Sequence, residues 1–239
     1  MAELFSSKHG VIVACDVKTK DELNKLVKST ADVDGIVGYK VGFILGLKYG
    51  LRTVVKTVKK HTDLPVIYDH QKAGTDIPEM GLEFATICKD SGIEGVIIFP
   101  QSGPETETAF IKALKDTGLT PLVGGEMTHP RYLEKDGGFI RNNAPEEMYV
   151  NGAKSGAEFF IVPGNKPDQI SNYARLLRGI IPQPKFCMPG IGRQGGDIES
   201  AFKATGGLPA YAIIGSAIYK SPDVRKSAED FGRMALGIS

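Results

Sequence analysis

The stretch Ile67-Tyr68-Asp69-His70-Gln71-Lys72-Ala73-Gly74-Thr75-Asp76-Ile77-Pro78 connects an apolar run to a helical pattern. The run from Leu64 to Tyr68 is typical of a buried strand, and Pro78 suits the first turn of a helix. Two aspartates and a lysine therefore follow the end of a strand, where each charge must be paired or solvated as it leaves bulk water. This cluster indicates either a site that manipulates charge or a solvated loop with surface ion pairs.

The same strand–loop–helix unit recurs about eight times along the chain. The expected strands are Val11–Cys15, Ile36–Val41, Val66–Asp69, Gly95–Phe99, Pro121–Gly125, Phe159–Val162, Phe186–Met188 and Ala212–Gly215. The expected helices are Asp21–Thr30, Leu51–His61, Pro78–Ser91, Pro104–Thr117, Pro145–Lys154, Pro167–Arg178, Ile198–Thr205 and Pro222–Leu236. Because the strands are apolar throughout, they should be buried on both faces of a parallel sheet. We therefore predict an α/β protein that forms one (β/α)8 TIM barrel over residues 1–239, with an open doubly wound sheet as the alternative.

Composition excludes several classes of function. The 239 residues are 41% hydrophobic and carry a net charge of +1, which gives no electrostatic footprint for nucleic acid or an anionic membrane. Cys15, Cys88 and Cys187 are odd in number and far apart, so we expect reduced, mostly buried thiols. The histidines show no metal-ligand spacing. Without a long apolar run or a signal pattern at the start, the protein should be cytoplasmic.

In a barrel of this kind, catalytic residues lie at the carboxyl ends of the strands. Those ends are polar here: they carry Asp16, Lys40, Asp69 with Lys72, Pro100, Glu126 with Thr128, Pro163 with Gly164, Pro189 with Gly190, and Ser216. Random surface decoration would not place polar groups at the ends of separate apolar strands. The pattern therefore favours a catalytic role for the stretch that follows Tyr68.

Four charges, Lys40, Asp69, Lys72 and Asp76, should converge on one mouth of the barrel. An alternating array keeps each carboxylate ionised and each lysine protonated. Such a lysine is an acid, whereas a Schiff-base lysine must be neutral. The array suits delivery of a proton to a developing carbanion, although for each single lysine a surface ion pair is the alternative.

A second candidate site is the loop from Met188 to Asp197, in which four glycines surround Arg193 and Gln194. Its backbone N–H groups can approach an anion closely, and late loops of α/β barrels commonly bind phosphate. The alternative is an ordinary glycine-rich turn. After the fifth strand, Thr128 supplies a hydroxyl for a ligand, whereas His129 suits only capping or packing.

Together these segments resemble the orotidine 5'-monophosphate decarboxylase family. The resemblance rests on Cys15-Asp16-Val17, Gly38-Tyr39-Lys40-Val41-Gly42, Asp69 to Pro78, Glu126-Met127-Thr128-His129-Pro130, Pro189-Gly190-Ile191-Gly192, Gln194-Gly195-Gly196-Asp197 and Ile214-Gly215-Ser216-Ala217-Ile218-Tyr219. It implies decarboxylation of orotidine 5'-monophosphate to uridine 5'-monophosphate in pyrimidine biosynthesis, with no metal or organic cofactor. It also implies a homodimer with active sites at the interface.

The resemblance assigns roles residue by residue. The implied catalytic residues are Lys40, Asp69, Lys72 and Asp76, and the implied substrate contacts are Asp16, Lys40, Ile77, Thr128, Pro189, Gly192, Arg193, Gln194, Gly195, Gly215 and Ser216. By this resemblance Asp16 and Lys40 hold the ribose hydroxyls, Asp69 faces the substrate carboxylate and Lys72 protonates C6. Asp76 and Ile77 come from the other subunit, Thr128 contacts the pyrimidine edge, and Gln194 with its glycines binds phosphate.

The chain departs from the family in three places. The family motif Asp-x-Lys-x-x-Asp is widened to Asp69-x-x-Lys72-x-x-x-Asp76, so Asp69 and Lys72 can share a face only if a bulge forms, which we predict at His70-Gln71. Ser216 replaces the phosphate-binding arginine of the eighth strand, and we hypothesise that Arg193 supplies that charge. Met80 stands where relatives often carry a threonine.

Two other functions fit the same fold. One is a magnesium-dependent hexulose 6-phosphate synthase or 3-keto-L-gulonate 6-phosphate decarboxylase, which would use a metal-stabilised enediolate. The other is a noncatalytic nucleotide-binding barrel. Asp76-Ile77-Pro78 and the segment around Thr128 favour the pyrimidine enzyme, but fold alone does not decide among the three.

Overall fold

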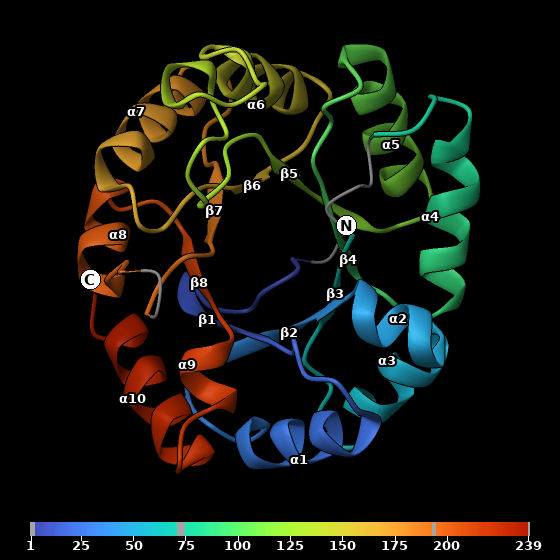
Figure 1. Cartoon of the computed structure of the whole chain (residues 1–239), viewed down its shortest axis with the longest axis vertical. Helices are drawn as coiled ribbons and strands as arrows, with labels where there is room; N and C mark the ends of the chain where they lie inside the picture. The colour runs from blue at the N-terminus through green and yellow to red at the C-terminus, as the bar shows by residue number, and fades with distance from the viewer. Residues whose placement is uncertain (1–2, 71–74, 193–194, 239) are drawn as a thin grey trace.

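A closed parallel barrel forms the centre of the molecule. The computed structural model describes residues 3–70, 75–192 and 195–238, and within them eight parallel strands pair in sequence order, with β8 returning to β1 (Figure 1). The strands are β1 (His9–Ala14), β2 (Ile36–Gly42), β3 (Val66–Asp69), β4 (Gly95–Ile98), β5 (Thr120–Gly124), β6 (Phe159–Ile161), β7 (Lys185–Met188) and β8 (Ala210–Ile214). The prediction of a (β/α)8 barrel is confirmed, and the open doubly wound sheet is wrong.

The helices form a ring around the barrel (Figure 1). The eight that alternate with the strands are α1 (Lys20–Thr30), α3 (Leu51–Lys59), α4 (Met80–Asp90), α5 (Pro104–Asp116), α6 (Ala144–Lys154), α7 (Pro167–Arg178), α8 (Ile198–Ala204) and α10 (Val224–Leu236). Three short additional elements were not predicted: α2 (Phe43–Tyr49), the 3-10 helix η1 (Glu134–Asp136) and α9 (Ser216–Tyr219). All three follow the carboxyl end of a strand, so they surround the mouth of the barrel.

Local capping explains several helix starts. Thr19 accepts a hydrogen bond from the N–H of Glu22, whose side chain bonds back to the Thr19 N–H, so α1 begins with a capping box. Pro78 was expected in the first turn of α4, but that helix begins at Met80. Pro78 instead lies in a preceding turn, in which the Ile77 carbonyl accepts from the Met80 N–H.

The strands are apolar on both faces because they separate two apolar layers. Side chains such as Val13 and Tyr68 pack outward against the helices, whereas Ile12, Ile67 and Leu122 pack together inside the barrel. Alternation along β3 therefore turns Tyr68 outward and Asp69 inward. A carboxylate at the end of this strand enters the barrel mouth as a direct result of the pleat.

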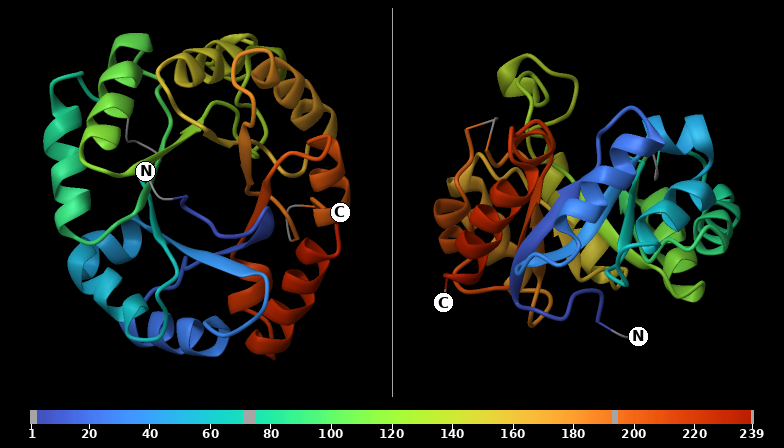
Figure 2. Two further views of the ribbon diagram at one scale, coloured as in Figure 1. Left: turned by 180° about the vertical axis from the view of Figure 1, so that it is seen from behind. Right: turned by 90° about the horizontal axis from the view of Figure 1, so that it is seen from below.

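The amino end of the barrel is closed by the N-terminal segment. Phe5 packs against Phe159 and Tyr211, with ring centroids 5.7 and 4.4 Å away, and the Tyr211 hydroxyl donates to the Ser7 carbonyl at 2.9 Å. This segment lies at the end opposite the long loop between β5 and α6 (Figure 2). Access to the interior is therefore from the carboxyl ends of the strands.

Glu107 of α5 is a buried acid whose ionisation should be visible in stability. It is 1% exposed, and its Oε2 accepts a hydrogen bond from Asn151 at 2.8 Å. Burial raises the pKa of Glu107 to about 7 from 4.5, and the Asn151 hydrogen bond opposes this only partly. The folded state therefore holds a proton that the unfolded state releases near pH 4.5, so this group makes stability fall as pH rises from about 4.5 to 7.

Glu107→Gln should remove that fall, because the amide does not titrate. The unfolding free energy of the variant relative to the unchanged protein should rise by about 3 kcal/mol between pH 4 and pH 8. Urea unfolding at a series of pH values measures this difference. A difference that is independent of pH would show that Glu107 does not hold its proton in the folded protein.

Candidate active site

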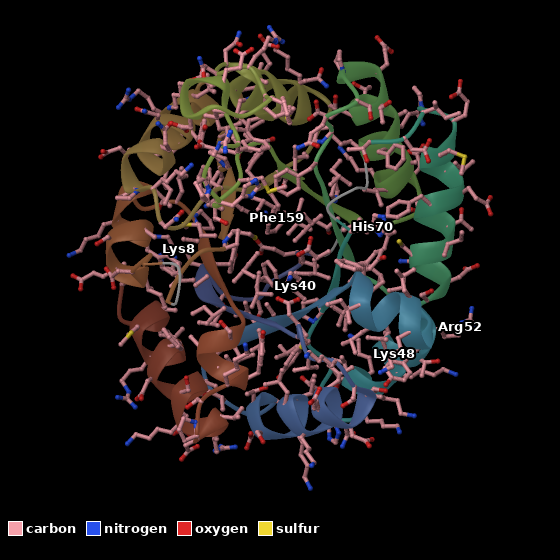
Figure 3. The ribbon with its side chains drawn as sticks, viewed as in Figure 1. Lys8, Lys40, Lys48, Arg52, His70 and Phe159 are labelled. Carbon is pink, nitrogen blue, oxygen red and sulfur yellow. The ribbon has the colours of Figure 1, made fainter. Side chains whose placement is uncertain are left out.

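Three charged side chains from neighbouring strands meet at the mouth of the barrel. Lys40 Nζ lies 2.7 Å from Asp69 Oδ2 and 3.2 Å from Asp16 Oδ1. Strand register brings them together, because Ala14 pairs with Lys40 and Gly42 pairs with Asp69. Figure 3 shows Lys40 inside the ring of strands. The predicted convergence of four charges is confirmed for Lys40 and Asp69, and Asp16 joins them from the end of the first strand.

Burial and charge act in opposite directions on Lys40. The Lys40 and Asp69 side chains are each 9% exposed, whereas Asp16 is 44% exposed. Burial lowers the pKa of Lys40, but the two carboxylates together outweigh burial and raise this pKa above its ordinary value. Lys40 is therefore an ammonium fixed between two aspartates rather than a group that exchanges protons.

The second oxygen of Asp69, Oδ1, is buried and has no hydrogen-bond partner in the part of the chain that the structure describes. A buried carboxylate oxygen without a donor costs free energy, and such costs concentrate at functional sites. The Lys40 ion pair thus fixes the Asp69 side chain through Oδ2 and leaves Oδ1 without a donor among the described residues.

A cavity of about 250 Å³ extends from this charge cluster across the barrel mouth. Several residues predicted from sequence line it together: Asp16, Lys40, Asp69, Thr128, Pro189, Gly215 and Ser216. Sequence analysis did not identify the apolar part of the lining, formed by Ile97, Phe99, Ile161 and Ile213, or Tyr219. Only strand alternation could have suggested these inward apolar positions. The cavity thus has a charged side and an apolar side, as expected for a flat, polar-edged ligand.

A second hollow of about 510 Å³ adjoins the first and shares Asp16, Lys40 and Asp69 with it. Its other wall is α2, where Phe43, Ile44 and Leu47 present apolar side chains. These three are largely exposed, and Leu47 reaches 80%. The charge cluster therefore stands between a polar cavity and an open apolar surface.

The described residues of the glycine-rich loop after β7 form tight turns. Gly190, Gly192 and Gly195 have positive φ angles of 93°, 84° and 87°, a region that favours glycine. The Gly192 N–H donates to the Gly196 carbonyl at 2.9 Å, and a Cβ on Gly196 would lie 2.8 Å from the Gly164 carbonyl oxygen. Larger residues would not fit this turn. Arg193 and Gln194 lie outside the described residues.

Asp76 does not join the charge cluster within this chain. Its side chain is exposed, and its Oδ1 accepts the N–H of Ile77 at 2.8 Å. Its carbonyl accepts a hydrogen bond from the Thr106 hydroxyl at 2.8 Å. We expected all four charges to converge on one mouth of the barrel. Within a single chain, Asp76 does not do so. Lys72, the fourth charge, lies outside the described residues.

The predicted bulge at His70-Gln71 includes Gln71, which also lies outside the described residues. His70 itself continues the outward alternation of Tyr68: its Nδ1 is 2.6 Å from the Tyr68 hydroxyl, and both rings pack near Phe84 of α4. Burial lowers the pKa of His70, against the opposing effect of Asp69. His70, labelled in Figure 3, thus fixes the end of β3 on its helix-facing side.

Other expectations concern the rest of the molecule. Cys15, Cys88 and Cys187 are free and buried, as predicted, and burial raises the pKa of each thiol. Among the described residues there is no group of three or more His, Cys, Asp or Glu side chains that could hold a metal ion. No helix in the described part of the chain is long and apolar enough to cross a membrane.

A closed parallel barrel with a buried ammonium–carboxylate cluster at the carboxyl ends of its strands defines a (β/α)8-barrel enzyme. Comparison with known proteins narrows the class. Residues 10–231 match the orotidine 5'-phosphate decarboxylase / HUMPS family, and the chain belongs to that family.

Individual relatives agree with this assignment. The chain is 31% identical over 221 residues to an orotidine 5'-phosphate decarboxylase of Pyrococcus horikoshii, covering 92% of this chain and 95% of the relative. It is also 30% identical to an orotidine 5'-phosphate decarboxylase of Pyrococcus furiosus, and the match covers 92% of this chain and 94% of that relative. A crystal structure of orotidine 5'-monophosphate decarboxylase from Methanocaldococcus jannaschii, complexed with the inhibitor BMP, superposes with a TM-score of 0.82 at 25% identity, covering 95% of this chain and 98% of that one.

Replacement of Lys40 tests the charge cluster. Lys40→Met should lower the unfolding free energy by about 3–5 kcal/mol, because it leaves the buried Asp69 carboxylate without its partner. The double variant Lys40→Met/Asp69→Asn should lose less unfolding free energy than Lys40→Met alone, because it no longer carries an unpaired buried charge. Denaturant unfolding measures both.

The matched control is Lys112→Met, which removes the exposed ion pair to Asp116 and should cost less than about 1 kcal/mol. If Lys40→Met were tolerated as well as Lys112→Met, the Lys40–Asp69 pair would not be the buried interaction described above.

Proposed function

We propose that the chain decarboxylates orotidine 5'-monophosphate to uridine 5'-monophosphate, as a carboxy-lyase of pyrimidine biosynthesis, with Lys72 as the proton donor to C6 and no cofactor. The observation that carries this proposal is the buried Asp69 carboxylate, which Lys40 holds at the cavity with one oxygen unpartnered among the described residues. Family membership and the names of the relatives support the same reaction.

The chemistry depends on bringing two negative groups together. The substrate carboxylate lies against Asp69, which cannot move away because Lys40 holds it. Binding of the rest of the nucleotide supplies the free energy for this contact, and the strain is relieved as the carboxylate leaves. The bond from C6 to the carboxyl carbon breaks, its electron pair stays on C6 and carbon dioxide departs. The Lys72 ammonium then gives its proton to C6.

The two sides of the cavity fit the parts of the nucleotide. The apolar wall of Phe99 and Ile161 suits the faces of the pyrimidine, and Thr128 contacts its polar edge. Asp16 and Lys40 hold the ribose hydroxyls. Pro189, Gly192, Gln194, Gly195, Gly215 and Ser216 surround the phosphate. Arg193 supplies the positive charge that the family carries at the position of Ser216.

A homodimer would complete the site. Exposed apolar side chains lie on α2 and around the start of α4: Phe43, Ile44, Leu47, Ile77, Met80 and Leu82. Both elements are on the right-hand side of the barrel in Figure 1, where the end of α4 rather than its start lies beside α2. A second copy that covers this surface can bring its Asp76 and Ile77 toward the hollow beside Asp69. Thr106 and the Ile77 N–H already hold Asp76 in an exposed position, as an exchanged residue requires.

The composition supports a cytoplasmic enzyme that acts on a small molecule. The net charge of +1 offers no attraction to nucleic acid or anionic lipid. The three buried thiols form no disulfide within the described residues, which is typical of a reducing compartment.

Lys72→Ala should separate chemistry from binding. The purified protein should convert orotidine 5'-monophosphate to uridine 5'-monophosphate, and the variant should lose at least about 1,000-fold in kcat because the proton donor is absent. Binding of uridine 5'-monophosphate, measured by calorimetry, should change less than about threefold, because Lys72 mainly serves the transition state. Lys112→Ala, on the exposed face of α5, is the control that should leave both unchanged.

Substantial residual turnover by Lys72→Ala would remove Lys72 from the chemistry. Tight binding of uridine 5'-monophosphate by an unchanged protein that does not turn over the substrate would instead identify a noncatalytic nucleotide-binding barrel.

Mixing two inactive variants tests the exchange of Asp76. A heterodimer of Lys72→Ala and Asp76→Asn subunits contains one site in which both residues are intact. Co-refolding equal amounts should therefore restore about one quarter of the unchanged activity, because half of the dimers are mixed and each has one good site. If no activity returns although gel filtration shows that mixed dimers form, Asp76 acts within its own chain.

A further inference from the structure

A fully partnered carboxylate lies in the cavity wall behind Thr128. Glu126 follows β5 and is 3% exposed. Lys166 Nζ donates to its Oε1 at 2.7 Å, and the Tyr173 hydroxyl donates to its Oε2. The Glu126 N–H donates to the Tyr149 hydroxyl at 3.1 Å. A buried carboxylate is tolerated here because both of its oxygens have strong donors.

The same ammonium also holds the main chain that carries Thr128. Besides Glu126, Lys166 Nζ donates to the Met127 carbonyl at 3.3 Å. That carbonyl belongs to the peptide that connects Met127 to Thr128, so its orientation sets the direction of the Thr128 backbone. Glu126, Met127 and Thr128 all line the cavity, whereas Lys166 is not among the lining residues. Lys166 therefore acts on the site through this segment.

On its other side, Lys166 belongs to the loop that supports the glycine-rich turn. It is the N-cap residue of α7, and its N–H donates to the Pro163 carbonyl at 3.1 Å. The Gly164 N–H in the same loop donates to the Pro189 carbonyl at 2.8 Å, and Gly196 packs closely against the Gly164 carbonyl. One ammonium thus links the segment of Thr128 to the loop against which the glycine turn rests.

We propose that Lys166 is a positioning residue that holds Thr128 in its substrate-binding orientation, through the Glu126 carboxylate and the Met127 carbonyl. This inference rests on the proposed contact between Thr128 and the pyrimidine. If it holds, Lys166 in the loop after β6 helps Thr128, which follows β5, to recognise the substrate. The alternative is that the Lys166–Glu126 pair only stabilises the fold.

The chain contains a matched control for that alternative. Lys59 forms an ion pair with Glu94 at 2.9 Å and donates to the Asp63 and Leu64 carbonyls. Its side chain is 28% exposed, close to the 31% of Lys166. Its carboxylate partner accepts the N–H of Val66, the first residue of β3, so this pair lies at the opposite end of the barrel from the cavity.

The test is a double-mutant cycle between Lys166→Met and Thr128→Val, with kcat, KM and unfolding free energy measured for each protein. Lys166→Met should raise KM about tenfold and change kcat less than about threefold, because it misplaces a binding contact. Lys166→Arg should restore KM to within about threefold, because a guanidinium can still bond the carboxylate. Lys59→Met should lower stability less, because its partner Glu94 is 40% exposed whereas Glu126 is 2% exposed, and should leave KM unchanged.

In the double variant the two effects should not multiply: once the Thr128 hydroxyl is absent, Lys166→Met should raise KM by less than about twofold more. Tyr173→Phe, which removes a hydrogen bond to Glu126 without removing a charge, should show a smaller rise in KM with the same dependence on Thr128. This second cycle decides the question if Lys166→Met does not fold.

The possible failures are distinguishable. Effects of Lys166 and Thr128 that multiply, or a KM for Lys166→Met that matches that of Lys59→Met, would overturn the positioning role and leave the Thr128 contact intact. If Thr128→Val alone left KM unchanged, the proposed pyrimidine contact would be wrong, and the positioning role would fall with it. In either case decarboxylation by the unchanged protein would be unaffected.

Discussion

The ion pair between Lys40 and Asp69 is the constraint on which the rest of the site depends. Two opposite charges, each 9% exposed, lie 2.7 Å apart at the end of an otherwise apolar barrel. Their desolvation is offset only if the geometry is held closely, and the paired strands β2 and β3 provide that geometry. Asp16, just beyond the end of β1, adds a second carboxylate, so the ends of three adjacent strands share one cation. A charge cluster of this kind is fixed before any substrate arrives, which is the condition for electrostatic catalysis.

The fold was largely predictable because its strands are buried on both faces. Runs such as Val66–Asp69 are apolar up to the strand end and then polar, so both the strand and its functional terminus were visible in the sequence. Short elements were not predictable: α2 begins at Phe43 without a side-chain cap, directly after β2, and its exposed apolar residues do not show a helical stripe facing the core. Pro78 was misplaced because a turn as well as a helix accepts proline at its start.

Within the site, predictability depended on whether a residue lies at or next to the carboxyl end of a strand. Asp16, Lys40 and Asp69 do, and they meet at the barrel mouth. Lys166 does not: its partner Glu126 is forty positions earlier in the chain, and no local pattern connects them. Asp76 was expected at the mouth because it belongs to the charged stretch after β3, whereas its side chain is exposed and its carbonyl accepts a hydrogen bond from Thr106. Contacts made between distant segments require the folded chain, because sequence spacing indicates only which residues share a strand or helix face.

The chain retains the family's charge cluster while altering two neighbouring features. The Asp69-x-x-Lys72-x-x-x-Asp76 spacing is wider than the family pattern, and Ser216 replaces an arginine. Lys40 and Asp16 form an ion pair at the mouth of a barrel that superposes on a family structure with a TM-score of 0.82. The departures thus lie at Lys72 and Ser216, the proposed proton donor and a proposed phosphate contact, and the buried Asp69 carboxylate is in place.

The most direct test of this account is the loss of orotidine 5'-monophosphate absorbance with purified protein, once in excess chelator and once with added magnesium. The account predicts equal turnover in both conditions, because the Asp69 carboxylate and Lys72 perform the chemistry without a metal. Turnover that requires magnesium, or turnover of sugar phosphates in place of this nucleotide, would contradict it.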